Sequence, residues 1–269
     1  MLNVKNLTMH FEDGKGEAEV VHQLNFNISD AEALGIVGES GSGKTVTALA
    51  IAGLRKRGLV IDSGSITLDD KELLKLTPKE WSKIQGKEIG MIFQEPMSSL
   101  NPTMKIGKQV EEALVLHTSL NKSERRKRVI KALEEVELAE PDKLYSKYPH
   151  ELSGGMRQRV MIASAMINKP RLLIADEPTT ALDTVTQGEI LKLLKRLIRL
   201  HKTSILFISH NLKVVAELCD RVLVMKDGIV VEEGQTNEIF ENPQNEYTRK
   251  LIEAIPKRVK EVEGITRIQ

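Results

Sequence analysis

Short runs of consecutive apolar residues recur along this chain, and helical patterns lie between them. Residues 33–38 (ALGIVG), 171–178 (RLLIADEP) and 203–210 (TSILFISH) are the clearest apolar runs. Runs of this kind, rich in branched residues, are typical of strands buried on both faces of a parallel sheet. Residues 45–54 and 188–200 carry apolar side chains at helical spacing, and the second stretch places four on one stripe: Ile190, Leu193, Leu194 and Leu197. The alternation of strands and helices predicts an α/β fold.

Two parts of the chain break this rhythm with strands of another kind. Residues 2–11, 20–28 and 65–70 near the start predict a smaller, antiparallel sheet. Residues 221–234 (RVLVMKDGIVVEEG) predict a hairpin that turns at Asp227-Gly228. The fold class is therefore α/β with an added antiparallel β subdomain.

The segment from about 100 to 165 is nearly all helical in pattern. Asn121 and Glu124 have the spacing of a capping box. Four apolar residues follow at helical spacing: Val129, Ile130, Leu133 and Val136. The basic run RRKR (125–128) is interpreted as a solvated helix face, because flanking glutamates offset its charge; a nucleic-acid contact is the alternative.

The composition is that of an ordinary globular protein and narrows the function only by exclusion. Hydrophobic residues make up 41% and charged residues 29% of the 269 residues, with a net charge of +1. Aromatic content of 3% argues against a stacking platform for single-stranded nucleic acid. The single cysteine, Cys219, rules out an intrachain disulfide and is expected to be a small buried hydrophobe. Neither a signal peptide nor an apolar run of membrane-spanning length is found, so the chain itself is expected in the cytoplasm.

Residues 38–45 (GESGSGKT) match the phosphate-loop pattern G-x-x-x-x-G-K-[ST] between a predicted strand and a predicted helix. The glycines let backbone N–H groups surround a phosphate, and the helix N-terminus adds partial positive charge. Lys44 would reach the β- and γ-phosphates, and Thr45 would ligate Mg²⁺. The residues expected to bind nucleotide here are Gly38, Glu39, Ser40, Gly41, Ser42, Gly43, Lys44 and Thr45.

Two carboxylates lie at the end of the apolar run in residues 171–178 and are the acidic groups expected at a nucleotide site. Asp176 ends that run, where it could hold Mg²⁺, and Glu177 stands where a base could activate water. Guanine recognition needs N-K-x-D, and residues 121–124 (NKSE) and 168–171 (NKPR) both lack its aspartate, which disfavours a GTPase. A P-loop kinase stays open on these residues alone.

The run LSGGMRQR (152–159) resembles the signature of ABC-type ATPases, the nucleotide-binding subunits of transporters, and other family motifs occur in order. Phe11 is placed like the aromatic that stacks on adenine, and Gln94 like the loop glutamine that senses Mg²⁺. Asp183, in ALD (181–183), matches the D-loop, and His210 matches the switch histidine at the γ-phosphate. The resemblance implies a P-loop NTPase (RecA-like) core with an antiparallel β subdomain and an inserted α-helical subdomain.

The family arrangement implies that two such chains dock head to tail around ATP. Ser153, Gly154 and Gly155 of one chain would then face the γ-phosphate held by residues 38–45 of the other. Glu177 and His210 would be catalytic, ATP and Mg²⁺ the ligands, and Thr45, Gln94 and Asp176 the metal-binding residues.

Met156 after LSGG, together with residues 92–102 and 242–256, is similar to the peptide/nickel importer branch. The iron–sulfur extension of some members is not expected, since its cysteines are missing. The branch implies separate transmembrane permease subunits, a second ABC ATPase subunit, an extracytoplasmic solute-binding protein acting indirectly, and no nucleic acid. It favours a heterodimer and leaves a homodimer open. The chain would lie on the cytoplasmic face of the membrane.

The substrate stays open among peptides, nickel and metal chelates, because it would pass through the permease. A soluble ABC ATPase acting on ribosomes or DNA is the alternative. The expected organisation is one nucleotide-binding domain over residues 1–255, with its helical subdomain at about 100–165. A polar C-terminal tail is expected over residues 256–269.

Overall fold

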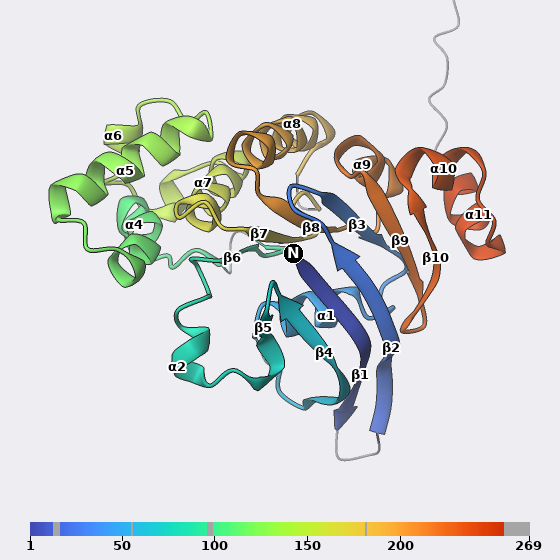
Figure 1. Cartoon of the computed structure of the whole chain (residues 1–269). Helices are drawn as coiled ribbons and strands as arrows, with labels where there is room; N and C mark the ends of the chain where they lie inside the picture. The colour runs from blue at the N-terminus through green and yellow to red at the C-terminus, as the bar shows by residue number, and fades with distance from the viewer. Residues whose placement is uncertain (13–16, 55, 96–98, 181, 256–269) are drawn as a thin grey trace, which may run out of the picture.

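The computed structural model describes residues 1–12, 17–54, 56–95, 99–180 and 182–255. The larger of two sheets in this part of the chain has six strands in the order β10-β9-β3-β8-β7-β6 (Figure 1). Strands β9, β3, β8, β7 and β6 pair in parallel, and β10 pairs antiparallel with β9. The strands are β3 (Ala33–Val37), β6 (Ile89–Ile92), β7 (Leu172–Asp176), β8 (Ser204–Ile208), β9 (Arg221–Lys226) and β10 (Ile229–Gln235). The α/β prediction is confirmed.

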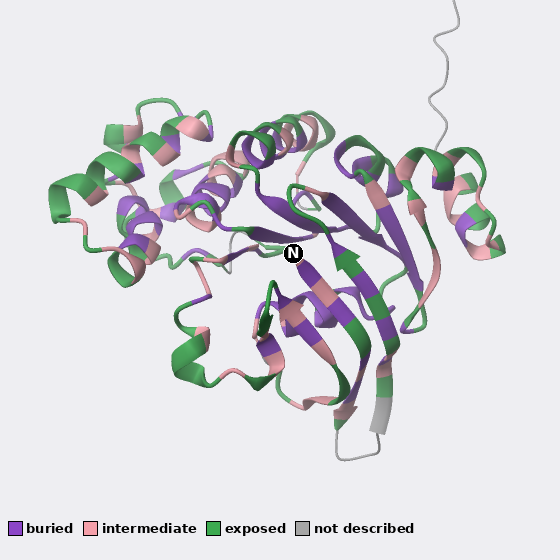
Figure 2. Ribbon diagram, in the orientation of Figure 1, coloured by how far each residue is buried: buried purple, intermediate pink, exposed green. Residues whose placement is uncertain are grey.

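Alternate residues of the central strands face two separate apolar cores. Figure 2 shows that these strands are buried. In β7, Leu173 and Ala175 pack with the helices α7 (Gly154–Met166), α8 (Thr184–His201) and α9 (Leu212–Leu218). Leu172 and Ile174 belong to the other core, with α1 (Lys44–Ile51) and the smaller sheet. The predicted stripe on α8 is buried in the first core: Ile190, Leu193, Leu194 and Leu197. Both faces of the sheet are therefore covered.

The smaller sheet is antiparallel, as predicted, in the order β2-β1-β4-β5. Its strands are β1 (Leu2–Glu12), β2 (Glu17–Ile28), β4 (Leu59–Leu68) and β5 (Lys71–Glu72), followed by η1 (Leu73–Lys75) and α2 (Pro78–Trp81). Strand β4 begins at Leu59, earlier than expected, because Asp62, Ser63 and Gly64 interrupt its apolar pattern. Gly64 has φ 102°, and a Cβ there would lie 2.6 Å from the Asn6 carbonyl oxygen of β1. The glycine permits this close approach.

A helical arm extends from one end of the larger sheet (Figure 1), as predicted for residues 100–165. It contains α4 (Ile106–His117), α5 (Lys122–Glu135), α6 (Pro141–Leu144), η2 (Pro149–Glu151) and the start of α7. The capping box is confirmed: Asn121 Oδ1 accepts from the Glu124 N–H at 3.1 Å, and Glu124 Oε2 accepts from the Asn121 N–H at 2.7 Å. Val129, Leu133 and Val136 are buried, and Ile130 is partly buried.

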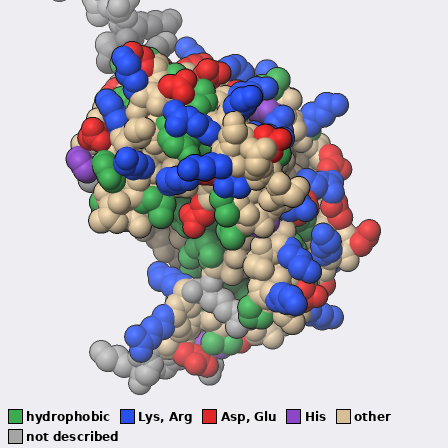
Figure 3. All heavy atoms as spheres, turned by 90° about the vertical axis from the view of Figure 1, so that its left-hand side faces the viewer, with side chains coloured by type: hydrophobic (Ala, Val, Ile, Leu, Met, Phe, Trp, Pro, Cys, Tyr) green, Lys and Arg blue, Asp and Glu red, His purple; other side chains and the backbone are tan. Residues whose placement is uncertain are grey.

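The interpretation of residues 125–128 as a solvated face is wrong for Arg125. Its Nε donates to Glu111 Oε1 at 2.8 Å, and Arg126 pairs with Asp142 at 3.3 Å. The partners thus come from neighbouring helices, and the sequence-adjacent glutamates do not pair with these two arginines. Lysine and arginine side chains are prominent on the arm (Figure 3).

The remaining elements lie at the β10 edge of the larger sheet. The β9–β10 hairpin turns at Asp227 and Gly228, with φ 47° and 78°, as predicted. Helices α10 (Thr236–Glu241) and α11 (Glu246–Glu253) pack beside it. Cys219 is buried, as expected. The expected tail over residues 256–269 lies outside the described residues.

Helix α1 ends at Ile51, before the Leu54 that its pattern predicted. Gly53, at φ 68°, lies against the Trp81 ring, and the left-handed backbone stops the helix. None of the helices in the described segments is long and apolar enough to cross a membrane.

Glu111 is a buried carboxylate that ties α4 to α5 and should set part of the acid stability. Burial alone would raise its pKa, but hydrogen bonds from Lys108, Arg125 and Tyr145 outweigh it and hold the pKa at about 2. Because this pKa lies below the usual 4.5, the stabilisation is complete above about pH 4.5 and is lost as the pH falls toward 2.

We predict that Glu111→Gln lowers the free energy of unfolding by roughly 2 kcal/mol at pH 7, the loss expected for hydrogen bonds to a charged group. Urea unfolding followed by circular dichroism measures it, and the difference from the unsubstituted chain should shrink at pH 3. Glu112→Gln, at the exposed neighbouring position, is the control. An equal loss in both variants would contradict the role of Glu111.

Candidate functional site

The predicted site residues gather where four parallel strands end. Gly38 follows β3, Gln94 lies two residues after β6, Glu177 follows β7 and His210 lies two residues after β8. Carboxyl ends of parallel strands meet at one edge, and ligands of open α/β sheets bind there. The topology therefore brings together residues that are far apart in the sequence.

The loop of residues 38–45 needs its glycines at two positions in particular. A Cβ on Gly38 would lie 2.0 Å from the Met225 carbonyl oxygen, and one on Gly43 would lie 2.6 Å from the Val20 carbonyl oxygen. Gly43 also has φ 96° and is the N-cap of α1. The backbone can thus turn tightly into the helix N-terminus, the arrangement that binds phosphate.

Lys44 spans the inside of this loop and is 5% exposed. Its Nζ donates to the Gly38 oxygen at 2.9 Å, the Glu39 oxygen at 2.7 Å and Ser42 Oγ at 3.3 Å. An ammonium has three donors, and the longest of these contacts is the one a phosphate oxygen would most easily replace. Burial lowers the pKa of Lys44, although the charges of Glu177 and Asp176 act in the opposite direction. The negative charge of a bound phosphate would act against burial and favour the charged form of Lys44.

Thr45 and Asp176 are brought into contact and have the chemistry of a magnesium site. The Thr45 hydroxyl donates to Asp176 Oδ1 at 3.3 Å. Asp176 is 4% exposed, and burial raises its pKa despite the Thr45 hydrogen bond. Hydroxyl and carboxylate oxygens are suitable Mg²⁺ donors, and a buried carboxylate gains from a cation. These two residues fit the expected metal. Gln94, the third expected ligand, donates its Nε2–H to Glu177 Oε2, and this bond does not use its amide oxygen.

Glu177 is held by three side chains at the edge of the sheet. Its backbone has φ 45°, and its N–H donates to the Ile208 oxygen at 2.9 Å, which fixes the turn after β7. Three groups lie within hydrogen-bond distance of its Oε2: Gln94 Nε2 at 3.2 Å, Thr180 Oγ1 at 2.9 Å and His210 Nδ1 at 3.1 Å. Motifs in the sequence pointed to Gln94, Glu177 and His210, but none pointed to Thr180, three residues along the same turn.

The second predicted anion-binding turn lies at the start of α7. Ser153 is its N-cap, and the hydroxyl accepts from the Met156 N–H at 3.3 Å. The space beside Gly154 is open, since apart from its chain neighbours and the backbone of its own helix no atom of the described residues lies within 4 Å of the position of a Cβ. Within the described segments, no hydrogen bond joins residues 153–155 to residues 38–45. The two turns are separate in a single chain.

The other predicted residues have local partners. Asp183 caps α8 by accepting from the Val185 and Thr186 N–H groups, and these bonds lower its pKa. Ala181 of the same motif lies outside the described residues. Phe11 carries the Lys56 ammonium 5.4 Å from its ring centroid.

At the entrance of the loop, Ser40 and Gly41 are exposed. The Glu39 N–H donates to the Tyr247 hydroxyl oxygen of α11 at 3.1 Å, a contact that the sequence analysis missed. The sequence of residues 242–256 carries a family resemblance, and nothing in its pattern points to the loop.

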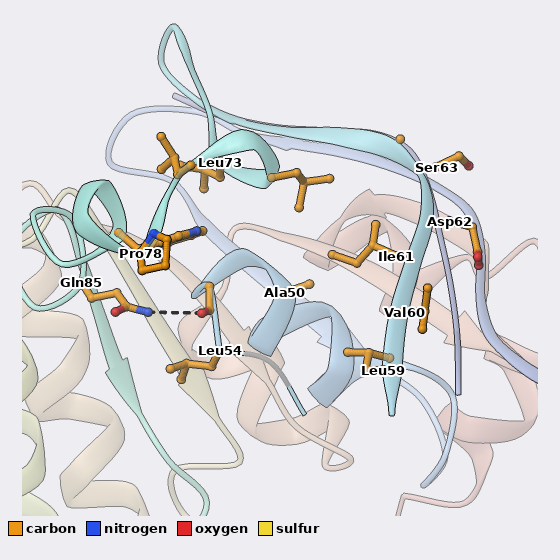
Figure 4. Close-up of a pocket in the computed structure, with 15 residues that line it drawn as sticks. Ala50, Leu54, Leu59, Val60, Ile61, Asp62, Ser63, Leu73, Pro78 and Gln85 are labelled. Atoms are coloured by element: carbon orange, nitrogen blue, oxygen red, sulfur yellow. Dashed lines mark hydrogen bonds between the residues drawn. The ribbon is translucent and has the colours of Figure 1, made fainter. Parts of the chain in front are cut away.

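A cavity of about 920 Å³ lies elsewhere, between α1, β4 and the η1–α2 segment (Figure 4). Leu54, Leu59, Ile61 and Leu73 give it an apolar lining, and Gln85 Nε2 lies 3.4 Å from the Gly53 oxygen. No residue of the 38–45 loop lines it. The phosphate loop and this cavity are therefore distinct places on the molecule.

Comparison with known families and proteins gives matches over most of the chain. The family described as "ABC transporter" matches residues 21–180, and "Oligopeptide/dipeptide transporter, C-terminal region" matches residues 231–269. The oligopeptide transport ATP-binding protein OppD of Bacillus subtilis is 48% identical over 263 residues, covering 95% of this chain and 72% of that protein. The dipeptide transport ATP-binding protein DppD of Lactococcus lactis is 43% identical, covering 95% and 74%.

Solved structures of ATP-binding cassettes are similar as well. A dimeric post-hydrolysis state of the cassette MJ0796 bound to ADP and Pi has a TM-score of 0.78 and 32% identity, covering 88% of this chain and 99% of that one. CbiO1 of Clostridium perfringens, part of the transporter complex CbiONQ, has a TM-score of 0.76 and 31% identity, covering 95% of each chain.

We predict that Lys44→Ala weakens nucleotide binding by about a hundredfold or more, because charge-assisted hydrogen bonds to phosphate are lost. Titration of the chain with a fluorescent ATP analogue measures the dissociation constant. Lys71→Ala, which removes an exposed lysine of the smaller sheet, is the matched control. Near-normal affinity in Lys44→Ala would remove residues 38–45 as the phosphate loop.

Proposed function

The chain belongs to the ABC transporter family of ATPases, and from this premise we propose that it is the ATP-hydrolysing subunit of a peptide importer. The observation that carries the catalytic part is the triply hydrogen-bonded Glu177 beside the loop that holds Lys44. Similarity to named oligopeptide and dipeptide transport proteins supports a peptide substrate over nickel or a metal chelate. It supports transport over the alternative role on ribosomes or DNA.

In the proposed site the triphosphate lies along residues 38–45, with the adenine stacked on Phe11. Lys44 contacts the β- and γ-phosphates. Thr45 and Asp176 would hold Mg²⁺, with the amide oxygen of Gln94 as a third ligand. The cation, when bound, neutralises phosphate charge.

Glu177 is the proposed general base. The hydrogen bonds recorded for its side chain in the described residues all end on Oε2, so Oε1 is the oxygen placed to accept from a water. The water oxygen attacks the γ-phosphorus, the bond from that phosphorus to the bridging oxygen breaks, and a water proton passes to Glu177. His210 Nδ1 lies 3.1 Å from Glu177 Oε2, and the other ring nitrogen, Nε2, would donate to the γ-phosphate when it carries a hydrogen.

The working site is proposed to need two ATPase chains. The open N-terminus of α7, at Ser153, Gly154 and Gly155, would bind the γ-phosphate held by the loop of the other chain, with Asp183 beside it. The dimeric cassette MJ0796 supports such an arrangement. A second, related ATPase is the partner we favour, with a copy of the same chain as the alternative.

A groove of about 370 Å³ is the proposed docking site for a transmembrane permease. It lies between the ends of α1 and β6 and the helices α4 and α7. Phe93 and Leu116 line it and are 40% and 70% exposed, which is costly for large apolar side chains without a partner. Gln94 follows Phe93 directly, so a permease segment in this groove would move the residue that touches Glu177.

The proposed location follows from this docking. The chain would be peripheral to the cytoplasmic face of the membrane, and a solute-binding protein would act only through the permease. The domain organisation is proposed as one nucleotide-binding domain over residues 1–255.

We predict that Glu177→Gln lowers ATP turnover by about 10²- to 10⁴-fold while ATP binding persists, because a general base contributes in that range. Phosphate release by the assembled transporter measures turnover, and analogue titration measures binding. Glu241→Gln, exposed on α10, is the control. Hydrolysis at the normal rate would exclude Glu177 as the base.

We predict that ATP converts the Glu177→Gln chain from its 30.1 kDa monomer to twice that mass, and that adding Ser153→Arg abolishes the shift. The arginine side chain would fill the turn that meets the partner's phosphate. Residue 153 lies outside the 38–45 loop of its own chain, so the substitution leaves that loop unchanged. Light scattering with and without ATP measures the mass. Dimers that survive Ser153→Arg would overturn the shared site; a Glu177→Gln chain that binds ATP as a monomer would assign the partner to a second ATPase.

A further inference from the structure

One peptide group at the entrance of the phosphate loop is held from both sides. The carbonyl oxygen of Gly38 accepts from Lys44 Nζ at 2.9 Å, and the N–H of the same peptide, on Glu39, donates to the Tyr247 oxygen at 3.1 Å. In a trans peptide the C=O and N–H groups point in opposite directions. Lys44 and Tyr247 therefore fix the rotation of this peptide together.

Tyr247 is itself anchored by the C-terminal part of the chain. Asn245 Oδ1 caps α11 by accepting from the Tyr247 N–H at 2.8 Å, and the Asn245 side chain also donates to the Val231 oxygen. The Glu232 carboxylate accepts from the Gln244 and Asn245 N–H groups at 2.7 and 3.1 Å. The start of α11 is thus fastened to β10.

The tyrosine ring is placed as firmly as its backbone. It packs at the edge of the core, on a helix that contacts β10, and the Lys226 ammonium lies 5.1 Å from its centroid. Lys226 ends β9, and the preceding residue, Met225, is the one whose carbonyl abuts Gly38. Ring, strand end and loop entrance form one contact region.

From this geometry we propose that Tyr247 is a positioning residue for the phosphate loop, and that the C-terminal segment 231–255 sets nucleotide affinity through it. The inference rests on the proposed role of residues 38–45. The family match describes this segment only as a C-terminal region. The proposal gives it a physical link to the nucleotide site, which is the hydrogen bond from Glu39 to Tyr247.

The physical reason is pre-organisation. With the 38–39 peptide fixed, its carbonyl stays available to Lys44, and Lys44 keeps the loop closed around the place of the β-phosphate. A carbonyl that accepts from an ammonium also polarises its peptide, which strengthens the N–H donor to Tyr247. Without the hydroxyl, nucleotide binding must order this peptide, and the cost appears as lost affinity.

A merely structural tyrosine would hold α11 on the sheet without affecting nucleotide. Tyr247→Phe separates the two roles, because phenylalanine keeps the ring over Lys226 and removes only the oxygen that accepts from Glu39. Glu246→Gln is the matched control: this neighbour on α11 is exposed and pairs with Lys250.

The experiment measures the dissociation constant of a fluorescent ATP analogue for the full chain, with thermal midpoints taken in its absence. We expect Tyr247→Phe to bind about three- to tenfold more weakly, the worth of one net hydrogen bond, with a midpoint close to that of Glu246→Gln. In the assembled transporter the KM for ATP should rise by the same factor at unchanged kcat. Amide exchange at Glu39 should accelerate in the nucleotide-free chain.

Unchanged affinity in Tyr247→Phe would overturn the proposal, and so would a lowered midpoint with normal affinity. Lys44→Ala distinguishes this failure from failure of the phosphate loop itself. If Lys44→Ala loses nucleotide and Tyr247→Phe does not, the loop stands and Tyr247 has no positioning role. If neither variant loses nucleotide, the loop assignment is wrong.

Discussion

The larger sheet is covered on both faces, and this constrains where the molecule can place its charged side chains. Strands such as β7 and β8 are buried on both sides, so they cannot carry charged side chains along their length without a partner. Polar groups must therefore come at the strand ends. Because β3, β6, β7 and β8 run in parallel, their carboxyl ends place the phosphate loop, Gln94, Glu177 and His210 at one edge. The chemistry is positioned by topology, and no local segment could supply it.

Burial then acts in opposite directions on two neighbouring charges. It lowers the pKa of Lys44 and raises the pKa of Asp176, and the attraction between these two groups only partly offsets both effects. A triphosphate would bring negative charge to Lys44, while a divalent cation would bring positive charge to Asp176. Each relieves a group that the fold has desolvated, so nucleotide and cation should bind better together than separately.

The sequence predicted what local patterns encode and missed what only the tertiary structure joins. The phosphate loop, the strands before it and the stripe on α8 follow from spacing over a few residues, and the structure has the strands and the stripe. The hydrogen bond from Glu39 to Tyr247 joins residues 208 positions apart, and no periodicity signals it. Arg125 was misread for the same reason: its partner, Glu111, lies one helix back, while the pattern offered only adjacent glutamates. The early start of β4 was missed because Asp62, Ser63 and Gly64 interrupt its apolar pattern, and the close approach to β1 that explains Gly64 is visible only in the structure.

Some of the predicted site residues already have hydrogen-bond partners within the described part of one chain, and others do not. Asp183 caps α8 and Gln94 holds Glu177, so both are satisfied without nucleotide. Gly154, in contrast, stands at the N-terminus of α7 with open space beside it, while a Cβ on Gly155 would lie 3.0 Å from Thr186 Cγ2. No acidic side chain lies in the first turn of α7. In the proposed pair of chains, a phosphate held by the second subunit would supply a counter-charge to the helix dipole, and only while the γ-phosphate is present. Closure of the proposed pair of chains would then be coupled to the state of the nucleotide, because the attraction would disappear with the phosphate that creates it.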